Sequence, residues 1–157
     1  MRTFTFIKDM PVFEKASGTI VGHVCDISIS ASGKVTGLLV KKNKLLHPLF
    51  FLDINDAHCT EDGILIENKN SLKKPLKPPA NTFLHQNSLT GKWIKNQKGE
   101  TVGLLKDVYF LEEMGTIVGY EYTDGFFSDL SEGTRILQSV IPPAIGKDAI
   151  IVDANPM

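Results

Sequence analysis

The stretch Phe13-Glu14-Lys15-Ala16-Ser17-Gly18-Thr19-Ile20-Val21-Gly22 decides the fold, because the chain repeats it as Ile94-Lys95-Asn96-Gln97-Lys98-Gly99-Glu100-Thr101-Val102-Gly103. The match keeps a constant offset as far as Asp26-Ile27 and Asp107-Val108. After one inserted residue it resumes, and the later pairs are Gly33–Gly37 with Gly115–Gly119 and Asp62–Ile66 with Asp148–Val152. Two copies of one fold unit therefore make up the chain.

Both copies have the sequence pattern of β-strands. Residues 19–27 and 35–40 are rich in β-branched and apolar residues, and a turn-forming Ser-Ala-Ser-Gly segment separates them. This pattern predicts a hairpin, and residues 101–110 and 116–122 predict its counterpart. Glycines inside the strands, Gly22 and Gly103 among them, favour tightly coiled small barrels with bends at the glycines. The only helical turns expected are at about 52–57 and 129–132.

The division of the chain follows from the repeat. At 157 residues it predicts a first barrel at 1–72, a linker at 73–81 and a second barrel at 82–157. Domains of roughly 70 residues can assemble only a small core, so each half is expected to lean on the other. The linker is rich in proline and lysine, which favours a semi-rigid, extended path.

Composition excludes several classes of protein. The 17 basic and 18 acidic residues nearly balance, so bulk charge offers no attraction to nucleic acid or anionic membranes. The two cysteines, Cys25 and Cys59, do not recur in the second copy, which favours reduced thiols over a disulfide framework. The first residues lack the apolar core of a signal peptide, and no stretch reaches the length of a membrane span. These features predict a soluble, cytoplasmic protein.

The repeated residues resemble a known family. Gly18 to Ile27 followed by Gly33 to Val40 is similar to the PRC-barrel pattern of a G-x-x-V-G-x-V-x-D strand and a G-K-V-x-G-L strand. Residues 99–108, 115–122 and 145–152 match the same pattern. The resemblance implies an all-β fold of two tandem small PRC-type β-barrels joined by the Pro/Lys-rich linker.

The resemblance also implies a role in contacts rather than in chemistry. Known settings of the family include the cytoplasmic subunit of photosynthetic reaction centres and the C-terminal domain of a ribosome maturation factor. The arrangement in this chain looks most like stand-alone double PRC-barrel proteins of Gram-positive, spore-forming bacteria, whose role is poorly defined.

Candidate catalytic and metal-binding residues have structural explanations. Asp26 and Asp107 recur just before a hairpin turn, where a carboxylate commonly accepts hydrogen bonds from nearby backbone N–H groups. The pairs His23/Cys25 and His58/Cys59 have residue types that bind zinc, but the second copy keeps neither pair. We therefore predict no enzymatic activity, no catalytic residues, no cofactor and no stoichiometric metal.

Surface recognition is the remaining function. The residues expected to contact a partner do not repeat and lie where the copies join or differ: Lys73, Lys74, Lys77, Phe126 and Phe127. They predict a non-catalytic binding or adaptor protein that contacts a protein partner. The alternative is an RNA- or ribosome-associated maturation factor that uses its lysines, although binding to RNA would be weak because no interleaved exposed aromatics or arginines are expected. A basic stripe joining the linker to Lys41–Lys44 would favour RNA, whereas an apolar groove at the barrel junction would favour protein.

Overall fold

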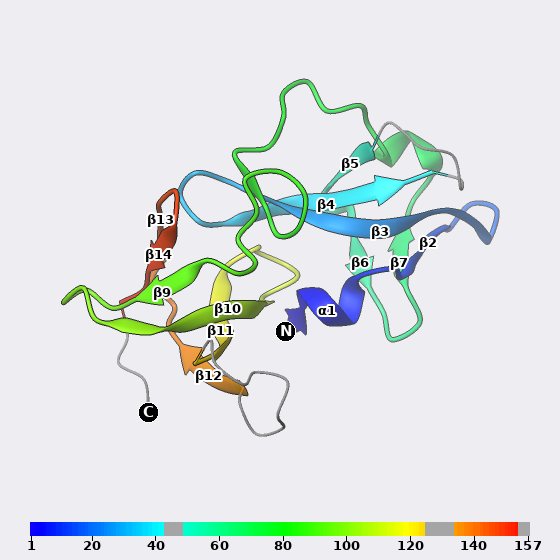
Figure 1. Cartoon of the computed structure of the whole chain (residues 1–157). Coiled ribbons are helices and arrows are strands. Elements are labelled where there is room, and N and C mark those ends of the chain that lie inside the picture. The colour runs from blue at the N-terminus through cyan, green and yellow to red at the C-terminus, as the bar shows by residue number, and fades with distance from the viewer. Residues whose placement is uncertain (43–48, 125–133, 154–157) are drawn as a thin grey trace.

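The computed structural model describes residues 1–42, 49–124 and 134–153, and these residues form two β-sheets (Figure 1). In the first half the elements are β1 (Arg2–Thr3), α1 (Phe4–Ile7), β2 (Pro11–Glu14), β3 (Thr19–Ile29), β4 (Val35–Lys41), β5 (Leu49–Asp53), η1 (Ile54–Asp56), β6 (His58–Cys59), β7 (Ile64–Ile66) and η2 (Lys69–Ser71). In the second half they are β8 (Asn81–Thr82), β9 (Trp93–Lys95), β10 (Thr101–Phe110), β11 (Ile117–Thr123), β12 (Thr134–Gln138), β13 (Ala144–Ile145) and β14 (Ala149–Ile151).

The two sheets have the same strand order. The first runs β5-β4-β3-β2-β7-β6 and the second runs β12-β11-β10-β9-β14-β13. In both sheets the fourth and fifth strands of this order are parallel, β2 with β7 and β9 with β14. The tandem all-β architecture predicted from the repeat is therefore confirmed, and the two hairpins lie where the sequence placed them. The predicted helical turn at 52–57 is present as η1, whereas the one at 129–132 lies outside the described residues. The single-turn helix α1 was not predicted.

The irregularities of the two long hairpins also repeat. The pairing register of β3 with β4 shifts between Val24 and Asp26, and that of β10 with β11 shifts at the equivalent place, between Leu105 and Asp107. Val24 faces Val40 while Asp26 faces Leu39, so the bulge turns Val24 and Asp26 to opposite faces of the sheet. Val24 then belongs to the core, and Asp26 points to the outer face, which other parts of the chain cover.

The glycines Gly22 and Gly103 mark equivalent positions, as expected. Each lies next to a register shift with the preceding strand, and neither has a positive φ. A Cβ on Gly22 would lie 2.7 Å from the Val40 side chain, and one on Gly103 would collide with the carbonyl oxygen of Thr123. Close packing of strands, rather than left-handed backbone, therefore requires glycine at these bends.

Each half adds its first strand to the sheet of the other half. β1 pairs with β10 through Thr3 opposite Tyr109, and β8 pairs with β3 through Thr82 opposite Ser28. Ser28 and Tyr109 are equivalent positions of the repeat, so the exchange is reciprocal. The rings of Phe4 and Phe83, which follow the two exchanged strands, lie 4.8 Å apart between centroids at the junction of the halves.

The tips of the two long hairpins, β3–β4 and β10–β11, also meet at the junction of the two halves. Lys34 forms an antiparallel bridge with Thr116, and the N–H of Val35 donates to the carbonyl oxygen of Gly115 at 2.8 Å. A single hydrophobic cluster runs through both halves, with fully buried members on each side. The halves therefore support one another, which is how two small cores reach a stable size.

Candidate binding surface

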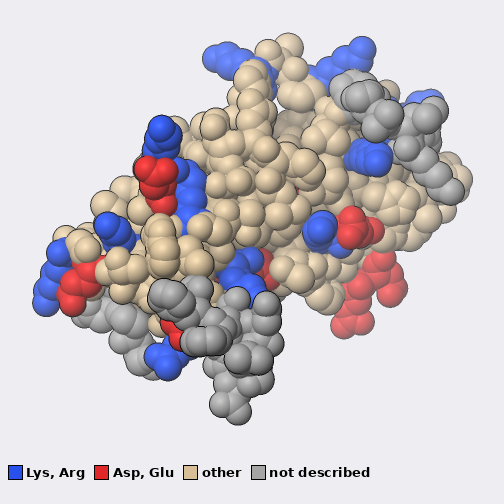
Figure 2. Space-filling model, viewed as in Figure 1, with Lys and Arg blue, Asp and Glu red and all other residues tan. Residues whose placement is uncertain are grey.

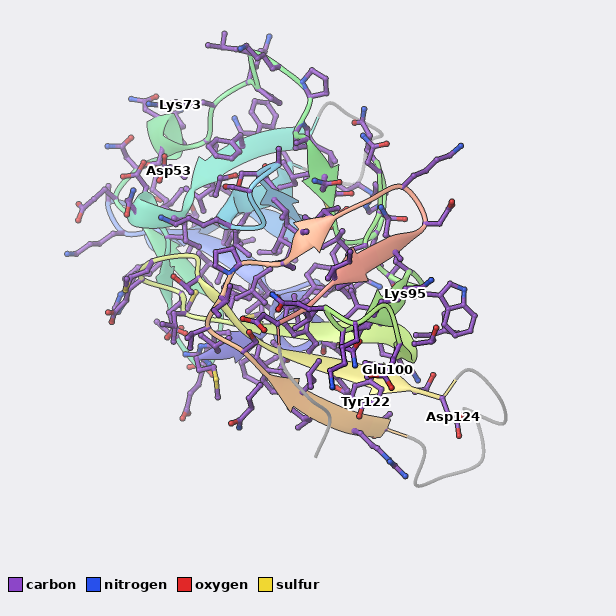
Figure 3. All side chains as sticks on the ribbon, turned by 90° about the vertical axis from the view of Figure 1, so that its left-hand side faces the viewer. Asp53, Lys73, Lys95, Glu100, Tyr122 and Asp124 are labelled. Carbon is purple, nitrogen blue, oxygen red and sulfur yellow. The ribbon has the colours of Figure 1, made fainter. Side chains whose placement is uncertain are left out.

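The linker lies along the outer edge of the first sheet. The N–H of Phe51 in β5 donates to the carbonyl oxygen of Lys73 at 2.7 Å, and the N–H of Lys73 donates back to Phe51 at 3.0 Å. Figure 3 shows Lys73 at this edge, near the end of β5 at Asp53. The reciprocal pair anchors the start of the linker to the sheet, and the prolines that follow restrict its path.

Beyond this anchor the linker covers two cavities on the outer face. One, of about 380 Å³, is lined by Ser28, Leu39, Phe51, Lys73, Lys74, Pro75, Leu76, Lys77 and Pro79. The other, of about 400 Å³, is lined by Leu39, Leu49, Lys74, Pro75, Pro78, Pro79, Thr82, His85 and Gln86. Both linings combine apolar walls with lysine side chains, and neither contains an acidic side chain from the described residues. We call the segment 73–77 with these cavities the linker surface.

The side chains of the linker surface are presented to solvent. Lys73, Lys74 and Lys77 are exposed, and Leu76 is exposed over its entire side chain (101%). In Figure 2 the top of the molecule, where Figure 1 places the linker, carries Lys and Arg without Asp or Glu on the visible face. The three lysines named by the sequence are thus brought together, whereas Phe126 and Phe127 lie outside the described residues.

A buried carboxylate fixes the chain that follows the linker. Asp26 is fully buried, and its Oδ1 accepts hydrogen bonds from the N–H groups of Phe83 (2.9 Å) and Leu84 (3.1 Å). Its Oδ2 accepts from the N–H of His85 at 2.9 Å and from the imidazole Nδ1 of His85 at 2.6 Å. Asp26 therefore accepts hydrogen bonds from three consecutive backbone N–H groups of the other half, and its negative charge strengthens these bonds.

The equivalent carboxylate makes the equivalent contact more weakly. Asp107 accepts from the N–H of Thr5 at 3.2 Å and from its own neighbour Val108 at 2.8 Å. The sequence predicted that both carboxylates accept nearby backbone N–H groups. They do accept backbone N–H groups, but those that join the halves come from residues distant in sequence. This contact was not predicted from the sequence, but the repeated Thr-Phe pairs at the ends of the exchanged strands, Thr3-Phe4 and Thr82-Phe83, could have signalled it.

The Asp26–His85 pair borders a cavity but is not paired with a nucleophile there. Thr82 Oγ1, the hydroxyl in the same lining, accepts from two backbone N–H groups and donates to the carbonyl oxygen of Gln86. Nδ1 of His85 lies 2.6 Å from Oδ2 of Asp26, and the His85 side chain is more than half exposed. This arrangement can orient a polar contact, but the part of the chain that the structure describes supplies no nucleophile paired with His85, as acyl transfer requires.

The family model for the PRC-barrel domain matches residues 2–73 and again residues 81–156. The chain belongs to the PRC-barrel family. A relative, the uncharacterized protein YrrD of Bacillus subtilis (strain 168), is 32% identical over 142 residues, which cover 88% of this chain and 79% of that protein. The match includes both halves of the chain and the linker between them.

The cysteines of this PRC-barrel protein are free, partly buried thiols. Burial raises the pKa of Cys25 to about 11, helped by the negative charge of Asp26, and burial raises the pKa of Cys59 to about 11, helped by Glu112.

Within the described residues, no group of three or more His, Cys, Asp and Glu side chains is placed to hold a metal ion. No helix among them is both long enough and apolar enough to cross a lipid bilayer.

Proposed function

We propose that this PRC-barrel protein is a non-catalytic adaptor that binds a protein partner through the linker surface. The observation that carries this proposal is the exposed Leu76 and its flanking lysines above apolar cavities. A fully exposed leucine is held there on an anchored, proline-restricted segment, so little conformational entropy is lost when it is buried by a partner.

The chemistry of the surface selects the class of partner. The two cavity linings contain lysines and no acidic side chain from the described residues, which favours an acidic partner, and their apolar walls favour one that inserts an apolar side chain. RNA is the less favoured partner, because the lysines lack arginine forks and the ring of Phe51 in the first lining is partly buried. Lys42, at the end of β4, stacks 4.1 Å from the ring of Phe50 instead of extending the basic surface into solvent.

The test is affinity capture with the full-length protein as bait, followed by identification of the captured proteins and RNA. One variant reverses the three linker charges (Lys73→Glu, Lys74→Glu, Lys77→Glu), and a second variant replaces Leu76 with serine. We expect both variants to lose the partner, and we expect nuclease treatment to leave capture by the natural protein unchanged.

A matched control reverses three exposed lysines elsewhere, Lys8, Lys98 and Lys106, which changes the net charge by the same amount. It should keep the partner. Equal loss in both triple variants would refute the linker surface as the binding site. Loss of all captured material on nuclease treatment would replace the protein partner with RNA.

A further inference from the structure

The outer edges of the two sheets are equivalent in the repeat but differ in what covers them. β5 pairs with β4 through Phe51 opposite Leu39, and β12 pairs with β11 through Ile136 opposite Glu121, in the same register. The two reciprocal hydrogen bonds between Phe51 and Lys73 lie on the side of β5 that faces away from β4. Among the described residues, β12 pairs only with β11.

The free edge has a defined set of hydrogen-bonding groups. Backbone groups alternate in direction along a strand, and the bonds of Phe51 to Lys73 show that this register position points outward. By the same register Thr134, Ile136 and Gln138 direct their N–H and C=O groups away from β11. An unpaired row of this kind is a template for an added strand.

The surface beside this edge is apolar where the first half is polar. A hollow of about 530 Å³ lies at the end of β12, and its lining includes Val118, Val140 and Ile141. The equivalent positions in the first half hold Thr36, Asn55 and Asp56. Val140 and Ile141 are 72% and 48% exposed, and Ile136 on the strand itself is 50% exposed. Val118, Val140 and Ile141 therefore form an apolar patch beside the end of β12.

The charge next to the outer edge also differs between the two halves. Leu39, over which Lys73 and Lys74 lie in the first half, is replaced by Glu121 in the second half. Glu121 forms no ion pair with the described residues, and with burial its charge raises the pKa of Tyr109 on the neighbouring strand. An added segment with a basic side chain at this place would meet a carboxylate instead of a leucine.

We propose that the β12 edge, with Glu121 and the apolar patch of Val118, Val140 and Ile141, takes up an extended basic segment of a protein partner as an added strand. The chain's own segment at Leu72-Lys73-Lys74 shows how such a segment is seated on this fold unit, with Leu72 buried and the two lysines exposed. The inference rests on the proposed protein-binding function but assigns it a second surface, at the opposite end of the molecule from the linker (Figures 1 and 3).

The probe is a capped synthetic peptide with the sequence of residues 69–77, titrated into the isotopically labelled full-length protein. We expect amide shifts at Thr134, Ile136 and Gln138, and at least tenfold weaker binding by the variant Glu121→Lys. The peptide with N-methyl groups on the backbone amides of Lys73 and Lys74 should also bind at least tenfold more weakly, because it lacks those two backbone donors.

The variant Ile136→Pro removes one outward N–H and no bond to β11, so the fold should persist while the peptide is lost. Ile136→Thr keeps the backbone donor and is its matched control. Amide shifts confined to β5 would mean that the peptide only competes with the linker, and they would overturn the proposal.

Amide hydrogen exchange of the free protein provides a second readout. Ile136 should exchange rapidly, whereas Phe51, bonded to Lys73, should be protected. Protection of Ile136 in the free monomer would show a covered edge and refute the proposal. Protection that rises with protein concentration, together with a doubled mass, would assign the edge to a second copy instead. Loss of partner capture on linker charge reversal, with peptide binding to β12 unchanged, would separate the two surfaces.

Discussion

Replacement of Asp26 by asparagine tests the contact that joins the two halves. An amide keeps one acceptor oxygen and puts an NH₂ group in place of the other. Both carboxylate oxygens of Asp26 accept short bonds from backbone N–H groups, Oδ1 from Phe83 and Oδ2 from His85, each at 2.9 Å. Whichever way the amide turns, at least one backbone N–H, the buried one of Phe83 or the partly buried one of His85, loses its acceptor and faces another donor.

The magnitude follows from the number of donors affected. A buried donor left without its partner costs about 1–3 kcal/mol, and bonds to a charged acceptor are worth about 1.5–3 kcal/mol each. We therefore expect Asp26→Asn to lower the free energy of unfolding by about 3 kcal/mol or more. That is a large share of the roughly 5–15 kcal/mol that stabilises an ordinary domain.

Asp107→Asn is the matched control in the same chain. Its Oδ1 accepts from Val108 at 2.8 Å and Thr5 at 3.2 Å, while Oδ2 has only a 3.4 Å contact with the same Thr5 N–H. An amide whose oxygen takes the Oδ1 place keeps both bonds, so the loss should stay below about 1 kcal/mol. Urea unfolding followed by circular dichroism measures both values. Equal losses in the two variants would refute this reasoning.

Three further predictions concern single side chains. Gly115→Ala should lower the free energy of unfolding by about 2 kcal/mol or more, because its φ is positive and its Cβ would meet the other hairpin tip; Gly18→Ala, with positive φ in open space, should cost about 1 kcal/mol in the same urea assay. Cys25 and Cys59 should react with iodoacetamide at pH 8 about a hundredfold more slowly in the folded than in the unfolded protein, because a pKa raised from 9.0 to about 11 leaves that much less thiolate; equal rates would contradict the burial. Tyr120→Phe should leave stability unchanged or raise it by up to about 1 kcal/mol, since the buried hydroxyl has no partner among the described residues; a loss above that in thermal unfolding would reveal one.

The repeat in the sequence was enough to predict the architecture. Its glycines and apolar residues recur in register, so the same small barrel is predicted for each copy. The hairpins at 19–41 and 101–123 were predictable because long strands carry many residues of periodic signal. The linker lysines were predictable as exposed, since a proline-rich segment cannot continue a central strand.

Short elements and long-range contacts were not predictable in this way. α1 is a single turn, and β1 and β8 contain two residues each, which is too short for any period to show. Their places depend on the partner half, because Asp26 and Asp107 hold backbone groups that are far away in sequence.

The two copies of an all-β unit could be recognised without the folded structure, because strand patterns and turn residues act over short distances along the chain and recur in both copies. The exchange of the first strands, the cover of the β5 edge by the linker and the lack of such cover on β12 among the described residues became visible only in the folded structure. Hydrogen bonds between distant backbone segments depend on which surfaces meet after folding, and every residue type except proline offers the same backbone donor and acceptor, so the residue types do not reveal such pairings.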